Sequence, residues 1–368
     1  MLLHTAPPFR AEHIGSLLRP HYLLDLRRKH SHNGAADEAL AAAEHKAIAE
    51  VVALQERVGL KLATDGEVRR NSYHSYFYQQ LGDVSLDPPP AHEHRSGVTS
   101  QPQAVIRSRL AWTRPIHVDD FKLLRGMTGA VPKITIPGPC ALHFRGGDAA
   151  ITATAYSNTD DFWSDIIEAF RSELNALAEA GCTYVQIDET AFAKFGDPDV
   201  QATLAARGDR WDALIDRYIE ITNRVLKDLP ATLRIGMHLC RGNRAGQWHS
   251  QGSYDAVADK LFNALAINFF FLEYDTPRAG DFTPLRLVPK HKSVILGLVS
   301  TKTSELENRD ELKRKIDDAS RYVALERLGI SPQCGFASVA EGNPITPDTQ
   351  EAKLRLVVDV ANDVWGSA

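Results

Sequence analysis

The chain has 368 residues, of which 43% are hydrophobic and 24% are charged, and these are ordinary values for a globular protein. Its 42 Lys and Arg residues against 47 Asp and Glu residues give a net charge of −5, which argues against a nucleic-acid-binding protein. Four cysteines in a chain of this length exclude a disulfide-stapled fold but allow a metal site. The sequence has no apolar run of roughly 18 residues and no signal-peptide pattern, so we expect a soluble, cytoplasmic protein without membrane partners.

Short segments rich in β-branched and aromatic residues alternate with helical patterns along the chain. The expected strands are 12–18, 61–68, 133–137, 184–189, 234–240, 268–275, 293–300 and 330–336. The expected helices are 37–58, 160–180, 210–229, 253–265, 309–328 and 349–364. This alternation predicts an α/β fold, a TIM (β/α)8 barrel, with a doubly wound open sheet as the alternative. No Gly-x-Gly-x-x-Gly follows the first strand, which argues against dinucleotide binding.

One region departs from this rhythm, at about residues 69–132. It contains an aromatic run at 73–78 and three consecutive prolines at 88–90. About 60 residues of this composition are few for an independent core. We therefore interpret the whole chain, 1–368, as a single barrel domain with an insertion after the second strand.

Polar side chains gather where the expected strands end, and in a barrel this is the edge on which active sites are built. The residues at or near these ends are His13, Ser16, Glu67, Asp188, His238, Cys240, Glu273, Lys302 and Cys334. If the strand assignments are right, residues far apart in the sequence line one pocket.

The His238-Leu239-Cys240 segment is the sharpest local feature, because residues two apart in a strand point to the same side. With Glu273 and Cys334 it forms a His-Cys-Glu-Cys set, whose donor atoms suit Zn²⁺. Two thiolates favour a further soft ligand such as a substrate thiol, which zinc would hold as a thiolate. The alternative is coincidence, since cysteine is also a common core residue, as we expect for Cys140 and Cys182.

Glu67 and Asp188 form a second group at the same edge. Two carboxylates in a pocket can bind a substrate ammonium group or transfer protons, and a structural hydrogen-bonding role is the alternative. Ser16 is a candidate for contact with the same substrate, and His13 could line the site beside it. The aromatic residues 73–78 either form a wall of the pocket or pack within the insertion.

These segments together resemble the C-terminal catalytic domain of cobalamin-independent methionine synthase. The segments that carry the resemblance are Ile14-Gly15-Ser16, Asp65-Gly66-Glu67, Ile187-Asp188-Glu189, His238-Leu239-Cys240, Glu273 and Cys334-Gly335. They occur in order over nearly the whole chain. The runs 9–20 and 240–243 are similar to those of the short, stand-alone members of this superfamily.

The resemblance implies a TIM barrel in which zinc is held by the residues at His238, Cys240, Glu273 and Cys334. It implies that Glu67 and Asp188 bind the amino group of homocysteine, which accepts a methyl group from N5 of a folate. The full-length synthase carries an additional N-terminal barrel for folate, without a counterpart in this sequence, so the methyl donor stays open. The synthase also has a proton-transferring His after the seventh strand; residues 297–302 contain none, which leaves Lys302 as the candidate proton donor.

The leading hypothesis is a zinc-dependent S-methyltransferase that activates a thiol such as homocysteine. One alternative keeps the zinc and opens an epoxide, as in epoxyalkane:coenzyme M transferase, although a sulfonate thiol would be repelled by Glu67 and Asp188. Another is a metal-free decarboxylase like uroporphyrinogen decarboxylase, for which Arg19, Arg241 and Arg244 could supply a cationic pocket. A binding protein without turnover is the remaining class.

Overall fold

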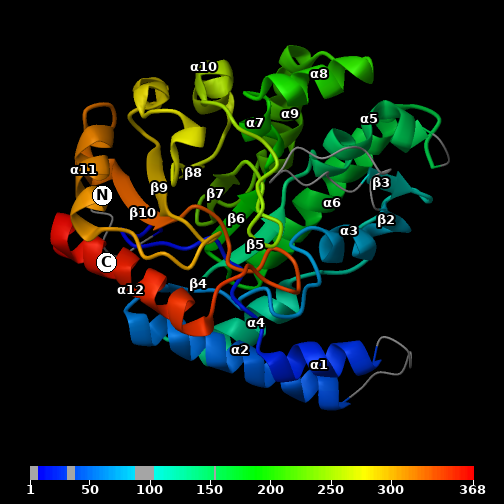
Figure 1. The fold of residues 1–368 in the computed structure, drawn as a ribbon. Coiled ribbons are helices and arrows are strands. Elements are labelled where there is room, and N and C mark those ends of the chain that lie inside the picture. The colour runs from blue at the N-terminus through cyan, green and yellow to red at the C-terminus, as the bar shows by residue number, and fades with distance from the viewer. Residues whose placement is uncertain (1–6, 31–37, 88–102, 153–154) are drawn as a thin grey trace.

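The computed structural model describes residues 7–30, 38–87, 103–152 and 155–368 (Figure 1). Short parallel strands lie at the centre and helices surround them, as the alternating pattern predicts. Six strands form one parallel sheet in the order β10-β9-β8-β7-β6-β5, so neighbours in the sequence are neighbours in the sheet. Their bounds are β5 (Ile134–Pro137), β6 (Tyr184–Asp188), β7 (Arg234–Leu239), β8 (Phe269–Glu273), β9 (Ser293–Val299) and β10 (Leu328–Pro332).

Two further segments extend this order at its ends. Strand β1 (Leu62–Ala63) pairs in parallel with β4 (Val131–Pro132), which continues one residue later into β5. At the other end, Ala11 forms a single parallel bridge with Ile330 of β10. Eight parallel segments therefore follow one another in chain order, which is the TIM-barrel-like α/β arrangement expected from the sequence.

The first expected strand, 12–18, is wrong: apart from the Ala11 bridge, this stretch is not a strand. The reason lies in its carbonyl groups, which accept hydrogen bonds from side chains instead of from a neighbouring strand. The carbonyl of His13 accepts from the Lys133 ammonium, that of Ile14 from Gln186 (2.7 Å) and that of Gly15 from Thr64 (2.7 Å). These three carbonyl groups are thus satisfied although the stretch is irregular backbone.

Six helices confirm the six expected ones, with ends shifted by a few residues. They are α2 (Glu38–Val58), α6 (Thr159–Glu179), α9 (Trp211–Leu226), α10 (Asp255–Ala264), α11 (Arg309–Ser320) and α12 (Pro347–Trp365). The expected start of α2 at 37 lies outside the described residues. Helix α11 is eight residues shorter than expected, because the chain has to become extended by Leu328 to pair with β9.

The structure contains further helices and turns that were not assigned residue ranges from the sequence. They are α1 (His21–His30), α3 (Ser75–Leu81), α4 (Val118–Met127), α5 (Ala141–Thr152), α7 (Ala191–Lys194), α8 (Pro198–Ala206) and the 3-10 turns at Pro277–Ala279, Thr283–Leu287 and Leu325–Arg327. Between β1 and β4 the chain forms α3, an antiparallel hairpin of β2 (Val84–Asp87) and β3 (Gln103–Ile106), and α4. The three prolines of this region lie outside the described residues, and we continue to interpret the region as an insertion.

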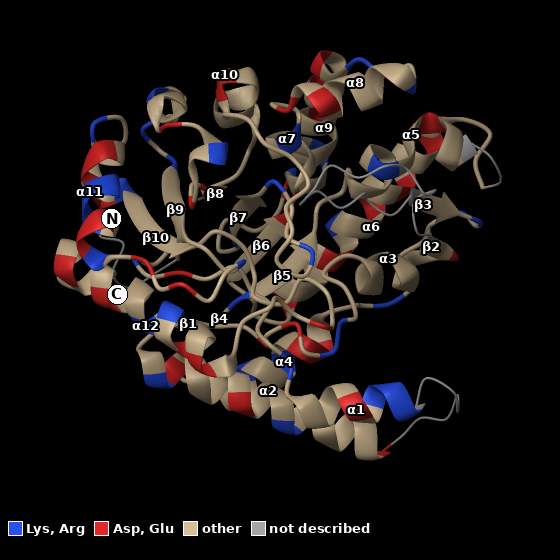
Figure 2. Cartoon of the chain, viewed as in Figure 1, with Lys and Arg blue, Asp and Glu red and all other residues tan. Residues whose placement is uncertain are grey.

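The outer helices bring the two halves of the sequence together. The last helix, α12, lies beside α2, and Arg57 of α2 forms an ion pair with Glu351 of α12 at 2.7 Å (Figure 1). Figure 2 shows both basic and acidic residues on the helices α2, α11 and α12. Within the described residues, no helix is long and apolar enough to cross a membrane.

A buried ion pair lies in the barrel interior. The Lys133 ammonium is 3.2 Å from Glu12 and also donates to Gln186 at 3.1 Å. Glu12 accepts two more hydrogen bonds, from Tyr184 Oη at 2.6 Å and from the amide of Phe9 at 2.9 Å. Both charged side chains are fully buried, so each is compensated by the other and by polar neighbours.

We expect Lys133→Met to lower the free energy of unfolding by about 3–5 kcal/mol, because it leaves the Glu12 carboxylate buried without its cation. Urea denaturation measures this difference. Lys260→Met is the matched control, since Lys260 pairs with Asp216 on the surface, where such a pair contributes about 1 kcal/mol or less. Equal effects of the two substitutions would contradict the assignment of Lys133 as a core residue on which folding depends.

Candidate metal centre and its pocket

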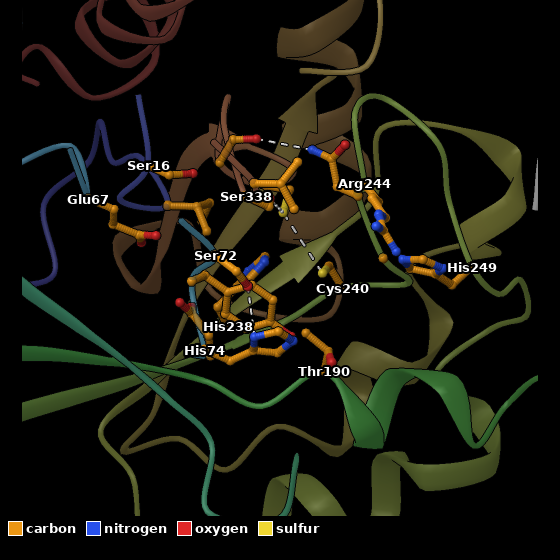
Figure 3. Close-up of a pocket in the computed structure, with 18 of the residues that line it drawn as sticks. Ser16, Glu67, Ser72, His74, Thr190, His238, Cys240, Arg244, His249 and Ser338 are labelled. Atoms are coloured by element: carbon orange, nitrogen blue, oxygen red, sulfur yellow. Dashed lines mark hydrogen bonds between the residues drawn. The ribbon is translucent and has the colours of Figure 1, made fainter. Parts of the chain in front are cut away.

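One open pocket lies at the carboxyl ends of the central strands, which is the edge predicted from the sequence (Figure 3). Six of the candidate residues line it: Ser16, Glu67, Asp188, His238, Cys240 and Cys334. Asp188 ends β6, His238 and Cys240 stand at the end of β7, and Cys334 follows β10. The structure therefore brings together residues from five separate parts of the chain.

His238, Cys240 and Cys334 form a compact group of possible metal ligands. One ligand atom of each residue lies within 4.8 Å of the others, and the two sulfur atoms are 3.9 Å apart. The period of strand β7 sends the side chains of His238 and Cys240 to the same side, as the sequence spacing predicts. All three residues are buried.

The electrostatics of this group fit a metal site. Among the described residues, neither ring nitrogen of His238 has an oxygen or nitrogen partner, although both are buried. A buried imidazole without such partners is costly unless something else binds it. The pKa of Cys240 is lowered well below its usual range, first by the hydrogen bond from the Cys334 thiol and then, against burial, by His238. One imidazole and two thiols, one of them readily ionised, are a donor set that suits a soft divalent metal.

Glu273 does not belong to this compact group. Its carboxylate is held by three other groups: Arg278 at 2.6 Å, Lys302 at 3.2 Å and the backbone amide of Arg241 at 2.5 Å. Burial alone would raise the pKa of Glu273, but Lys302, Arg241 and Arg278 lower it to about 2. The expected fourth ligand is thus a buried carboxylate that is ion-paired beside the His-Cys-Cys group.

Lys302, the candidate proton donor, is part of the same ion-paired cluster. Its ammonium contacts Glu273 at 3.2 Å and Asp275 at 3.4 Å, and it is not one of the residues that line the pocket. Because two carboxylates hold this ammonium, its pKa is raised in spite of burial. This position lets Lys302 fix the orientation of Glu273.

His13 also lies away from the pocket lining. Its Nε2 donates to Gln55 at 2.8 Å, and its Nδ1 accepts from the amide of Gly15 at 3.2 Å. Burial, and then the charge of Lys133, lower the pKa of His13 well below its usual value, so the ring is neutral. Both nitrogens have structural partners, and the expected contact between His13 and a substrate has no support in this arrangement.

Ser16 reaches the pocket through a close contact between the first and last segments of the barrel. Its Oγ accepts a hydrogen bond from the amide of Ala337 at 3.3 Å. A Cβ atom on Gly335 would lie 1.9 Å from this oxygen, so only glycine allows the loop after Cys334 to approach Ser16. The absence of a side chain at Gly335 therefore brings Ser16 next to the residue that follows Cys334.

Glu67 is held in an uncommon backbone conformation, with φ at 54°. A non-glycine residue in this region is strained and persists only where its surroundings hold it. Its amide donates to Asp65 at 2.9 Å and its carbonyl accepts from Arg19 at 2.8 Å. The side-chain Oε1 accepts from Thr135 at 2.8 Å, whereas Oε2 has no partner among the described residues. Glu67 thus presents a buried carboxylate oxygen that is available to a ligand.

Asp188 lies opposite His238 in the pairing of β6 with β7. Its Oδ1 accepts from Gln186 at 2.7 Å. Burial raises the pKa of Asp188 to about 7, and the neighbouring charge of Glu67 acts in the same direction. A ligand with a positive charge would stabilise both carboxylates in their ionised form.

Several pocket residues were not predicted from the sequence as site residues. They include Thr190 and the cations Arg145 and Lys194, whereas Tyr73 and His74 come from the run 73–78 that was considered as a wall of the pocket. Arg145 lies on α5 and Lys194 ends α7, and neither helix was expected. A lysine six residues after Asp188 was the one available signal, since the loop after a barrel strand faces the site.

The other two cysteines are core residues, as expected. Burial raises the pKa of Cys140 well above its usual value and that of Cys182 to about 12. Neither lines the pocket.

We expect iodoacetamide to modify Cys240 of the metal-free folded protein well before Cys140 and Cys182. The thiolate is the reactive form, and of these three thiols only Cys240 opens onto the pocket and has a lowered pKa. Peptide mass spectrometry after timed labelling at neutral pH measures the order. Modification of all four cysteines at one rate would contradict it, and labelling in urea provides the unfolded control.

Comparison with known proteins gives a consistent result. A family model described as "Cobalamin-independent synthase, Catalytic domain" matches residues 10–363. The uncharacterized protein YxjG of Bacillus subtilis is 38% identical over 368 residues, which cover 99% of this chain and 97% of that protein. Methionine synthase of Pyrococcus abyssi is 25% identical over 324 residues, or 88% of this chain and 85% of that protein.

A solved structure shows the same similarity in three dimensions. It is that of a candidate vitamin-B12-independent methionine synthase from Listeria monocytogenes, which is 30% identical in sequence. The match covers 98% of this chain and 99% of that chain, with a TM-score of 0.74. The chain therefore belongs to the catalytic-domain family of the cobalamin-independent synthases, a family of methionine synthase-like methyltransferases.

Proposed function

We propose that this protein is a zinc-dependent S-methyltransferase that transfers a methyl group to an amino-thiol such as homocysteine. The observation that carries the proposal is the combination within one pocket of the His238-Cys240-Cys334 group and the free carboxylate oxygen of Glu67. The first supplies donors for a thiol-binding metal, and the second supplies an acceptor for an ammonium group. Family membership supports methyl transfer as the reaction.

Zinc is the metal that the donor set favours, because two sulfurs and an imidazole nitrogen match its preferences. Zinc bound here would lower the pKa of a substrate thiol and hold it as the nucleophilic thiolate. Zinc sites with three protein ligands keep a position for substrate. We propose His238, Cys240 and Cys334 as the three ligands, and Glu273, the expected fourth, as the carboxylate that Lys302 and Arg278 hold beside them.

The protein's own residues orient the amino-thiol. Glu67 and Asp188 would bind its ammonium group, because both carboxylates line the pocket near the thiol ligands. The Ser16 hydroxyl lies beside Cys334-Gly335 and is placed to contact the carboxylate of the same molecule. These contacts would direct the sulfur toward His238 and Cys240, so that the reacting atom takes up one orientation.

The methyl donor is the second substrate, and a methyl-folate is the first candidate from the resemblance. Its departing nitrogen requires a proton, and the sequence nominated Lys302 for this role. Lys302 is held between Glu273 and Asp275, outside the pocket lining. We therefore propose Lys302 as a positioning residue for Glu273.

We expect the purified protein to bind about one equivalent of zinc and Cys240→Ser to weaken zinc binding at least tenfold, because it removes a thiolate ligand. Competition with a chromophoric chelator measures the affinity. Cys182→Ser is the matched control, since Cys182 is a buried thiol outside the pocket. The proposal fails if the wild-type protein binds no zinc or if the two variants retain it equally.

We expect Glu67→Gln to weaken homocysteine binding to the zinc-loaded protein by about tenfold or more, because a charge-assisted contact with the ammonium is lost. Calorimetry with 4-mercaptobutyrate, which lacks the amino group, should show little difference between wild type and variant. Coenzyme M tests the alternative acceptor. If it binds more tightly than homocysteine, or if Glu67→Gln affects both amino-free and amino-bearing thiols equally, the amino-thiol assignment is wrong.

A further inference from the structure

Two cations line the pocket without a role in the function proposed above. Lys194 stands at the end of α7 and is only 2% exposed, and Arg145 lies on α5. Burial, and then the charge of Arg145, lower the pKa of Lys194 to about 7. A lysine that is buried to this extent is normally paired with an acid.

Neither cation has such a partner. In the ranges that the structure describes, no carboxylate oxygen lies within 4.0 Å of Lys194 or Arg145. Arg145 donates to the Ala141 carbonyl and to Tyr73 Oη, and its Nε is buried without a partner. Glu189 and Glu273 act on Lys194 electrostatically, but both oxygens of each carboxylate already accept hydrogen bonds from other groups.

An unpaired buried cation at a pocket wall carries an energetic cost that an anionic ligand can offset. A guanidinium group and an ammonium group together are well suited to a carboxylate, because the guanidinium offers two parallel donors. The arrangement at Lys194 and Arg145 thus has the chemistry of an anion-binding subsite.

The two cations lie close together. The Lys194 ammonium stands over the ring of Phe144, the residue before Arg145, at 5.5 Å from the ring centroid. Both cations line the pocket that also contains Glu67 and Asp188. Figure 3 shows Ser16 and Glu67 on one side of Cys240, and Arg244 and His249 on the other.

The head group of an amino acid does not need Lys194 or Arg145 for its binding. Its ammonium and carboxylate are two bonds apart, so a head group bound at Glu67 and Asp188 keeps its carboxylate near Ser16. The cations are then left for the other substrate of the reaction.

We propose that Lys194 and Arg145 form a subsite for a carboxylate of the methyl donor. This inference rests on the proposed function and names the chemical class of its second substrate, a methyl donor that carries an anionic group. Arg244, which is exposed at the pocket rim, would guide that group inward.

The test uses bromide as an anion probe, located by its anomalous scattering in crystals of the zinc-loaded protein. We expect a bromide ion in contact with Lys194 and Arg145 in the wild-type protein, retained in Lys194→Arg and lost in Lys194→Met. Circular dichroism shows whether each variant is folded. Absence of bromide between these two side chains in the wild-type protein would overturn the proposal.

A second arm identifies which substrate uses the subsite. The same crystals are soaked with bromide and homocysteine together, and we expect both to be bound. Calorimetry should show that Lys194→Met changes the dissociation constant of homocysteine by less than about twofold. Displacement of bromide by homocysteine, or a tenfold loss of homocysteine affinity in Lys194→Met, would assign the cations to the acceptor and overturn the donor subsite. Failure of homocysteine to bind the wild-type protein would instead count against the proposed function, while the bromide sites still report on the cations.

Discussion

The hydrogen bonds of Lys133 in the barrel interior hold the pocket in place. Its ammonium contacts Glu12, the His13 carbonyl and Gln186, which come from two other segments of the barrel. Gln186 in turn donates to Asp188 at 2.7 Å, so a chain of hydrogen bonds runs from the buried ion pair to a pocket carboxylate. Two residues after Lys133, Thr135 donates to Glu67 at 2.8 Å. One polar layer therefore positions both acids of the pocket.

This layer also explains why the first segment of the barrel is irregular. A regular strand would direct its carbonyl groups to its neighbours, whereas here those of residues 13–15 accept from side chains inside the barrel. The gain is that Ser16 comes close to Gly335 and thus to Cys334. The loss of strand pairing is offset by charge-assisted and amide hydrogen bonds, since no backbone carbonyl of this stretch is left without a partner.

The sequence was sufficient to predict what depends on short-range periodicity. The spacing of His238 and Cys240, the alternation of strands with helices, and the gathering of acids at strand ends follow from the two- and 3.6-residue periods. The contacts of Glu273 could not be predicted, because its partner Arg278 lies in a short 3-10 turn and its partner Lys302 lies in a loop. Arg145 and Lys194 were missed because α5 is interrupted at Gly147 and α7 has only 4 residues.

The pocket that results contains both acids and cations. Glu67 and Asp188 line it together with Lys194 and Arg145, and in a partly dry pocket such charges are weakly screened. In the proposed reaction the acids would hold the ammonium group of the acceptor, and the cations would hold a carboxylate of the donor. Two different substrates could then enter one pocket without competing for the same charges. For a transfer reaction this division matters more than affinity, because it would fix the orientation in which the sulfur and the methyl group meet.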